Sequence, residues 1–357
     1  MPRIKTSTIP EQVAAHLREG IARGHWVEVL PGRDQLAVEL GVSPRSIQKA
    51  ITILEKEGLL VSHGQGRRTG IRLPESKLEA NPIRVGILCF RRADRGDGYV
   101  IELRHQLEEA GHIPVICHQG LQELGMSVKR VARLVKSTKA DAWVVVAGSG
   151  EVLQCFVDED IKVFALAGRR SELPIAGTGP EKAPRYKEVV QHLIRLGHTR
   201  ISFLCQSQLR KPAPSTSSRA ILEALEEAGL VTGEYNLPHW EETPEGLKAI
   251  LESLFQTTPP TALLLDEPHI FHAAYHFVSQ RGLRVPQDVS MICTDGSVDF
   301  DWCIPTVAHV AWDYQPVVRR IMKWVRNVAR GVDDRGQGYT GARYIEGGTV
   351  GPPPGST

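Results

Sequence analysis

The sequence lacks the long apolar runs and paired cysteines that mark several protein classes. No run of about 18 apolar residues occurs, so no membrane-spanning helix is expected. The N-terminal stretch lacks the apolar core of a secretory signal. The six cysteines are scattered without a C-x-x-C pair, which is typical of buried thiols in a reducing compartment. These absences predict a cytoplasmic protein with no membrane partner.

Motifs of common enzymes are also missing. The sequence has no G-x-S-x-G elbow, no Walker A loop and no H-E-x-x-H helix. His269, His272 and His276 share one helical face, but no cysteine or carboxylate cluster completes a metal site, so we interpret them as scattered histidines on a helix. We therefore expect neither an enzyme nor a bound cofactor or metal.

The net charge is only +2, but it is unevenly distributed. Residues 1–75 hold 11 lysines and arginines against 8 acidic residues, whereas the remainder holds 32 against 33. This small surplus favours a nucleic-acid surface near the N-terminus.

The first 73 residues carry the pattern of a winged helix-turn-helix. Apolar residues at helical spacing follow Pro10, and a second short helix around Leu36 is closed by Gly41. Ser43 is a suitable N-cap for a third helix from Pro44, and two short strands follow around a glycine-bearing tip.

Polar side chains on this segment suit a DNA duplex. The N-terminal end of a recognition helix faces base edges in the major groove, and the wing approaches phosphates. The ordinary alternative is a solvated helix followed by a plain hairpin. The residues predicted to contact DNA are Arg33, Ser43, Arg45, Ser46, Gln48, Lys49, His63, Gln65, Arg67 and Arg68.

Residues 9–72 resemble the GntR family of bacterial regulators. The resemblance rests on LP-x-x-x-x-LA from Leu30, on LGVS from Leu40, on LEKEGLL from Leu54 and on the glycine-rich wing. One departure is Asp34, which stands where the family commonly has a DNA-contacting arginine, beside Arg33. The resemblance implies a DNA-binding domain and leaves the base specificity open.

A polar segment with prolines at both ends, residues 74–82, is predicted to be a linker. From Ile83 the chain alternates apolar strand patterns with amphipathic helices, which is typical of parallel α/β sheets. The strands are too many for one sheet, so we expect two lobes in residues 83–350, with a weak strand near Leu237. Ligands of such folds bind at the carboxyl ends of strands, here between the lobes.

Several stretches of this region resemble the effector domain of the LacI/GalR family. They include HLIRLGHTRISFL from His192, RAILEALEEAGL from Arg219 and RGLRVPQDVSMICTDGS from Arg281. The resemblance covers roughly residues 83–347 and is clearest in the second lobe. It implies a two-lobed, periplasmic-binding-protein-like domain that binds a small molecule.

Effector contacts follow from that resemblance and from the chemistry of sugar binding. Carboxylates accept hydrogen bonds from hydroxyl groups, and an aromatic ring can stack on a sugar face. For Trp302 a core position is the alternative, and for Arg219 a surface ion pair. The predicted effector-binding residues are Arg219, Asp266, Glu267, Asp295 and Trp302.

Together these patterns predict a homodimeric transcription regulator. It would bind a double-stranded DNA operator and respond to a small, carbohydrate-like effector. Two alternatives stay open: a sugar-binding protein, and an α/β-domain enzyme with an accessory winged helix.

Overall fold

A computed structural model describes residues 8–23, 26, 29–61, 69–71 and 82–355. The chain divides into two units, Met1–Asn81 and Pro82–Thr357. The predicted linker lies outside the described residues except for Pro82, so its boundaries remain a prediction. No helix in the described part of the chain has both the length and the apolar character needed to cross a membrane.

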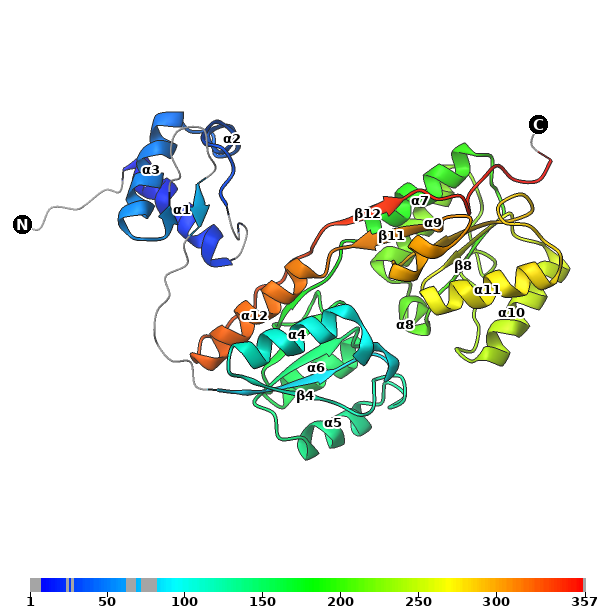
Figure 1. Cartoon of the computed structure of the whole chain (residues 1–357), viewed down its shortest axis with the longest axis horizontal. Helices are drawn as coiled ribbons and strands as arrows, with labels where there is room; N and C mark the ends of the chain where they lie inside the picture. Colours follow the sequence, from blue (N-terminus) through cyan, green and yellow to red (C-terminus); the bar gives the residue numbers. More distant parts are fainter. Residues whose placement is uncertain (1–7, 24–25, 27–28, 62–68, 72–81, 356–357) are drawn as a thin grey trace, which may run out of the picture. The chain divides into compact units, whose positions relative to one another are not determined.

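The first unit holds three helices and a small hairpin (Figure 1). Its elements are α1 (Ile9–Arg23), α2 (Arg33–Glu39), α3 (Pro44–Lys56), β1 (Leu60–Val61) and β2 (Gly70–Ile71). The two strands pair antiparallel. This is the helix-turn-helix followed by a wing that the sequence predicts.

A small apolar core holds these helices together. Leu17 of α1, Leu36 of α2 and Leu54 of α3 are fully buried in it. Gly41 has a φ of +64°, a conformation that glycine adopts without strain, and it ends α2 so that α3 can begin after Ser43. The turn thereby fixes the direction in which α3 begins.

The second unit contains two lobes, as expected. The sheet of the first lobe is entirely parallel, with strand order β4-β3-β5-β6-β7. The strands are β3 (Arg84–Leu88), β4 (Ile113–Ile116), β5 (Ala142–Val146), β6 (Val163–Leu166) and β7 (Ala176–Thr178).

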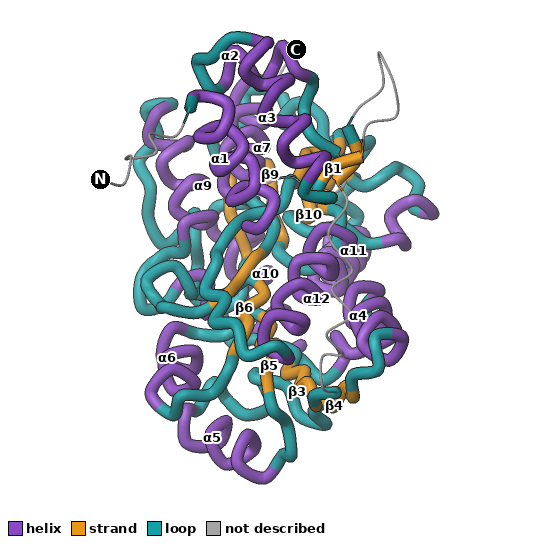
Figure 2. The backbone as a smooth tube through the Cα atoms, turned by 90° about the vertical axis from the view of Figure 1, so that its left-hand side faces the viewer, coloured by secondary structure: helices purple, strands orange, loops and turns teal. Residues whose placement is uncertain are grey.

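Helices cover both faces of this first sheet. In Figure 2, α5 and α6 lie on one side of β5 and β6, and α4 and α12 lie on the other. The helices are α4 (Gly98–Glu109), α5 (Val128–Ser137), α6 (Gly150–Asp158) and α12 (Gln315–Ala329). A short 3₁₀ helix, η1 (Ala93–Gly96), precedes α4.

The second lobe is also built around a largely parallel sheet. Its strand order is β12-β11-β10-β9-β8, and only β12 runs antiparallel. Its strands are β8 (Ile201–Leu204), β9 (Ala262–Leu265), β10 (Ser290–Cys293), β11 (Ala308–Trp312) and β12 (Ala342–Ile345). Its helices are α7 (Ala183–Arg195), α8 (Ser207–Arg210), α9 (Thr216–Glu227), α10 (Pro244–Thr257) and α11 (Pro268–Gln280), with the 3₁₀ helix η2 (Val298–Trp302).

The chain passes between the lobes three times within residues 82–355: after β7, after β11 and after α12. Helix α12 follows β11 of the second lobe but buries Val317, Ile321 and Trp324 in the core of the first. The first lobe is therefore built from two separate parts of the sequence.

One strand prediction is wrong. The segment near Leu237 is a turn, although Phe203 N donates to Asn236 O at 2.8 Å and the side chain of Asn236 donates to Ile201 O at 2.9 Å. Side-chain and main-chain bonds thus hold this segment against the edge of β8 without a regular ladder.

Candidate DNA-binding surface and effector site

The start of α3 is fixed by its own side chains. Ser43 Oγ accepts from Ser46 N at 3.1 Å, and Pro44 occupies the first turn. The predicted N-cap is therefore confirmed. The hydroxyls of Ser43 and Ser46 also lie 3.0 Å apart, so each already has one partner.

Helix α3 has one buried and one exposed face. Its buried residues are Ile47, Ala50, Ile51 and Leu54, as the apolar spacing predicts. Arg45, Gln48 and Lys49 are exposed, and Ser46 is half-buried. Three long polar side chains near the N-terminal end of α3 are thus free of the core of their own unit.

The other predicted DNA contacts are less defined. Arg33 begins α2 with its side chain 51% exposed, and its Nε lies 3.2 Å from Asp34 Oδ1. The acidic neighbour thus already binds the arginine that could replace the family's usual contact. The predicted wing residues His63, Gln65, Arg67 and Arg68 lie outside the described residues.

A cavity of about 300 Å³ lies between the lobes of the second unit. Phe90, Arg91 and Gln122 of the first lobe line it, opposite residues of the second lobe. It lies beyond the carboxyl ends of β3, β8 and β9, where ligands of parallel sheets bind. The residues of the second lobe that matter below are Gln206, Trp240, Glu242, Asp266, Glu267 and His269.

Arg91 bridges the two lobes across this cavity. Its guanidinium lies 2.8 Å from Glu267 and 2.9 Å from Asp94, and Nη1 lies 3.0 Å from Nδ1 of His269. Burial and the positive charge of Arg91 lower the pKa of His269 to about 4, so this imidazole is neutral near pH 7. Arg91 was not singled out from the sequence.

Asp266 and Glu267, both predicted effector contacts, lie on the cavity wall. Asp266 is only 5% exposed, and its Oδ2 accepts from Gln206 N at 2.6 Å. Its Oδ1 is buried and has no hydrogen-bond partner. Burial, then the charge of Glu267, raises the pKa of Asp266 well above its usual value. A buried oxygen without a hydrogen-bond partner is costly, so a donor that reached Asp266 Oδ1 would stabilise this group.

Glu267 is also perturbed. Burial raises its pKa to about 7, which the Arg91 guanidinium opposes and the Asp295 carboxylate reinforces. Its Oε2 accepts from Arg91, and its Oε1 accepts from the side chain of Gln206. This carboxyl group therefore titrates near neutral pH in the folded protein.

Asp295 lies behind this wall and already has partners within the second lobe. Its Oδ2 lies 2.8 Å from Nζ of Lys182, and its Oδ1 accepts from Nε1 of Trp312 and from Gly296 N, each at 2.9 Å. The structure does not place Asp295 among the residues that line the cavity.

The structure places the remaining two predicted effector residues outside the cavity. Arg219 lies on the exposed side of α9, and Trp302 is 88% exposed at the end of η2. The aromatic side chains that do line the cavity are Phe90 and Trp240. Trp240 donates from Nε1 to Cys205 O at 3.0 Å, which holds its ring in place.

A second arginine joins the lobes. Arg169, which follows β6, donates to the main-chain oxygens of Gln208 and Lys211 at 2.9 Å and of Ala213 at 2.5 Å. One first-lobe side chain thereby satisfies three carbonyl groups at and after α8 of the second lobe. The guanidinium fork suits such multiple contacts.

The three histidines of α11 diverge. His269 contacts Arg91, the ring of His272 packs against Phe271 and Phe300, and His276 is exposed. Among the residues that the structure describes, no group of three or more histidine, cysteine or acidic side chains is arranged to hold a metal ion.

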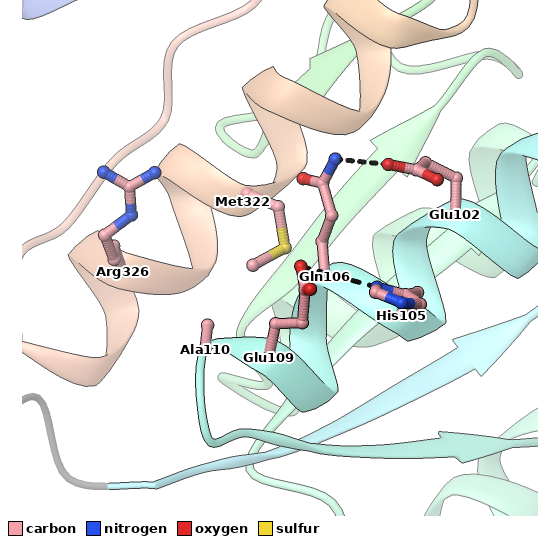
Figure 3. Close-up of a pocket in the computed structure, with 7 residues that line it drawn as sticks. All are labelled: Glu102, His105, Gln106, Glu109, Ala110, Met322 and Arg326. Atoms are coloured by element: carbon pink, nitrogen blue, oxygen red, sulfur yellow. Dashed lines mark hydrogen bonds and ion pairs between the residues drawn. The ribbon is translucent and has the colours of Figure 1, made fainter.

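A further hollow of about 430 Å³ lies between α4 and α12 (Figure 3). Its residues include His105 and Glu109, which lie 3.4 Å apart, and Arg326 of α12. It lies towards the C-terminal end of α4, away from the carboxyl ends of the strands where parallel sheets bind ligands. The interlobe cavity is therefore the better candidate for a ligand site.

Both units match known protein families. Residues 9–71 match the model of bacterial regulatory proteins of the gntR family, and residues 190–350 match that of the periplasmic binding protein-like domain. The "HTH-type transcriptional repressor PurR" of Haemophilus influenzae is 32% identical over 110 residues, 29% of this chain and 31% of the relative. The "HTH-type transcriptional regulator DegA" of Bacillus subtilis is 24% identical over 189 residues, 52% of this chain and 55% of the relative. The chain spans about a third of the first curated relatives that it matches.

Solved structures share the fold. A putative transcriptional regulator LacI from Bacillus cereus subsp. cytotoxis has a TM-score of 0.64 at 17% identity, over 75% of this chain and 98% of that chain. A transcriptional regulator CelR–cellobiose complex has a TM-score of 0.61 at 15% identity, over 90% and 100%. The chain therefore joins a segment that matches the gntR-family model to a segment that matches the periplasmic binding protein-like domain, and its fold is similar to that of LacI-type regulators of known structure.

Proposed function

We propose that the chain is a sequence-specific DNA-binding regulator of transcription whose operator affinity is set by a small effector in the interlobe cavity. The observation that carries the proposal is the exposed polar end of α3 on a GntR-type unit, followed by a domain with a ligand-sized cavity. A cavity of this volume suits a small metabolite.

On the DNA side, α3 enters the major groove. Arg45 and Gln48 read base edges, because bidentate side chains distinguish base pairs there. Contacts to phosphates come from the other residues, which position the unit and make binding salt-dependent. The proposed phosphate and backbone contacts are Arg33, Ser43, Ser46, Lys49, His63, Gln65, Arg67 and Arg68.

On the effector side, Asp266 and Glu267 accept hydrogen bonds, and Trp240 offers a ring face. Asp295 binds Lys182, whose positive charge favours the ionised forms of Asp266 and Glu267. Closure of the lobes on the ligand changes the spacing of two DNA-binding units in a homodimer. The lac repressor dimer bound to operator, a solved structure with a TM-score of 0.58, is a precedent for such an assembly.

The test is binding of labelled DNA from upstream of the gene, measured by anisotropy with and without unlabelled random DNA. Arg45→Ala is expected to lose roughly 1–3 kcal/mol of specific binding and to relax sequence preference. Lys56→Ala removes the same charge from the other end of α3, where Lys56 is also exposed, and serves as the matched control. If wild type and Arg45→Ala gave equal footprints and equal affinities, Arg45 would not belong to the DNA-binding site.

A further inference from the structure

Carboxylates outnumber cationic side chains in and beside the interlobe cavity. The acidic groups are Asp94, Glu242, Asp266, Glu267 and Asp295, and the cationic groups are Arg91, Lys182 and Arg210. His269 adds no positive charge near pH 7, because its pKa is lowered to about 4 by burial and by Arg91. Because the pKa of Asp266 is also raised, its charge is left out of the count; the other four acidic groups still face three cationic ones, so the site has a deficit of positive charge.

The cations that are present already have partners. Arg91 lies between Asp94 and Glu267, and Lys182 binds Asp295. Arg210 donates to main-chain oxygens at 3.0 and 3.2 Å and lies 3.9 Å from Glu242. The protein's own cations are thus committed elsewhere and do not contact Asp266.

Asp266 is the acidic group on this wall that none of these cationic side chains contacts. It is 95% buried (5% exposed), it lines the cavity, and its Oδ1 has no hydrogen-bond partner. Glu242 lies on the same wall, where its carboxylate accepts from Ser207 N. Two acidic groups on one wall, one of them with an oxygen that has no partner, favour a ligand that supplies a hydrogen-bond donor.

Apolar side chains lie beside these acidic groups. Phe90, Trp240, Leu247 and Ile270 contribute apolar surface to the same cavity. A ligand that fills this space must therefore present a donor-rich end to the acids and an apolar or ring face to the aromatic side chains.

We infer that the effector carries a protonated amino group, bound beside Asp266 and Glu242, and a ring face packed against Trp240. This inference rests on the proposed function and names the ligand class of the same site. An amino sugar or an arylalkylamine meets both demands. An anionic ligand would add to the negative charge, and a neutral sugar would leave the imbalance uncorrected.

The experiment compares matched pairs that differ only in the amino group: D-glucosamine with D-glucose, D-galactosamine with D-galactose, and 2-phenylethylamine with 2-phenylethanol. Thermal shift and calorimetry use the full chain at pH 7.5. At least one amine is expected to bind about tenfold or more tightly than its neutral partner, because a charge-assisted bond replaces a neutral one. Stabilisation by neutral members only, or by no amine of the panel, overturns the inference.

Two variants locate the effect. Asp266→Asn keeps an acceptor for Gln206 N, and Glu242→Gln keeps one for Ser207 N, so neither should disturb the fold. Both are expected to reduce the preference for the amine to within about twofold of the neutral partner. Glu234→Gln, an exposed residue outside the cavity, is the control and should retain the preference. If both cavity variants retained the preference for the amine, the proposed amine-binding site would be wrong.

Failure of the inference can be distinguished from failure of the proposed function by the same DNA-binding assay. If a neutral sugar binds and changes operator affinity, the ligand class is wrong and the regulator stands. If an amine binds with the expected preference and operator affinity does not change, the ligand class stands and the regulatory role is wrong.

Discussion

At the scale of single residues, the second-lobe side of the interlobe cavity places two acidic groups next to each other. Asp266 and Glu267 are adjacent in sequence, Asp266 is buried and Glu267 is half-buried, and the charge of Glu267 raises the electrostatic cost of ionising Asp266. Arg91 lowers the cost of ionising Glu267 from the opposite lobe. The charge of a bound ligand, the protonation of these two acidic groups and the contact of Arg91 with Glu267 therefore influence one another.

The raised pKa of Glu267 predicts how stability depends on pH in the ligand-free protein. An unfolded glutamate releases its proton near pH 4.5, whereas the folded Glu267 keeps it to about pH 7. The resulting stabilisation is complete below pH 4.5 and is lost as pH rises through 7, by roughly 1–3 kcal/mol. We expect Glu267→Gln to flatten this fall in melting temperature between pH 5 and 8.

Glu234→Gln provides the control for that measurement, because Glu234 is exposed. Its melting temperature should follow the wild-type curve at every pH. If the melting temperature changed by the same amount between pH 5 and 8 in wild type, Glu267→Gln and Glu234→Gln, the role of Glu267 would be contradicted.

At the scale of elements, two loops that follow strands of the first sheet contribute contacts between the lobes. Arg91 follows β3 and Arg169 follows β6, and each reaches the second lobe. The two contacts lie on different segments, so each can be removed separately.

Removing the Arg169 contact should favour an open arrangement of the lobes. Arg169→Ala leaves three carbonyl groups of the 208–213 segment without their shared donor. We expect faster hydrogen exchange in this segment and about a tenfold weaker affinity for whichever ligand closes the cavity. Arg195→Ala, an exposed arginine of α7, should change neither. Unchanged exchange in Arg169→Ala would show that this contact does not restrain the lobes.

Much of this architecture could be predicted from the sequence, because its elements are amphipathic or wholly apolar and end at glycines. Helix α3, with its cap and buried face, agrees with its pattern residue by residue. The predictions did not include β7, β11, β12 or α12, although α12 carries apolar residues at helical spacing from Val317 to Val325. Its return to the first lobe has no local signal, because it depends on which lobe has an uncovered sheet face.

The cavity was only partly predictable for the same reason. Asp266 and Glu267 follow a buried strand, and the rule for parallel sheets points to such residues. Arg91 also follows a strand, but its contact with Glu267, 176 positions away, depends on the closure of two lobes. Trp240 lies in irregular chain without periodicity, whereas Trp302 has the right residue type on an exposed turn.

At the scale of the whole molecule, the proposal requires that ligand and operator act on one equilibrium. If a ligand changes operator affinity by some factor, the operator must change ligand affinity by the same factor. We expect equal factors, roughly 5–150-fold, from anisotropy and calorimetry at one salt concentration. Asp266→Asn should reduce both factors together, while operator affinity without ligand stays at the wild-type value. Unequal factors would contradict a two-state coupling.

The route of α12 also bears on how the protein is made. The first lobe is encoded mostly before residue 180, yet the apolar side of its sheet that faces α4 is completed by residues 315–329. During translation part of the sheet of this lobe stays uncovered until α12 has left the ribosome. The first lobe is therefore completed only after most of the second lobe has been made, and a nascent chain stalled before α12 would be a natural client of chaperones.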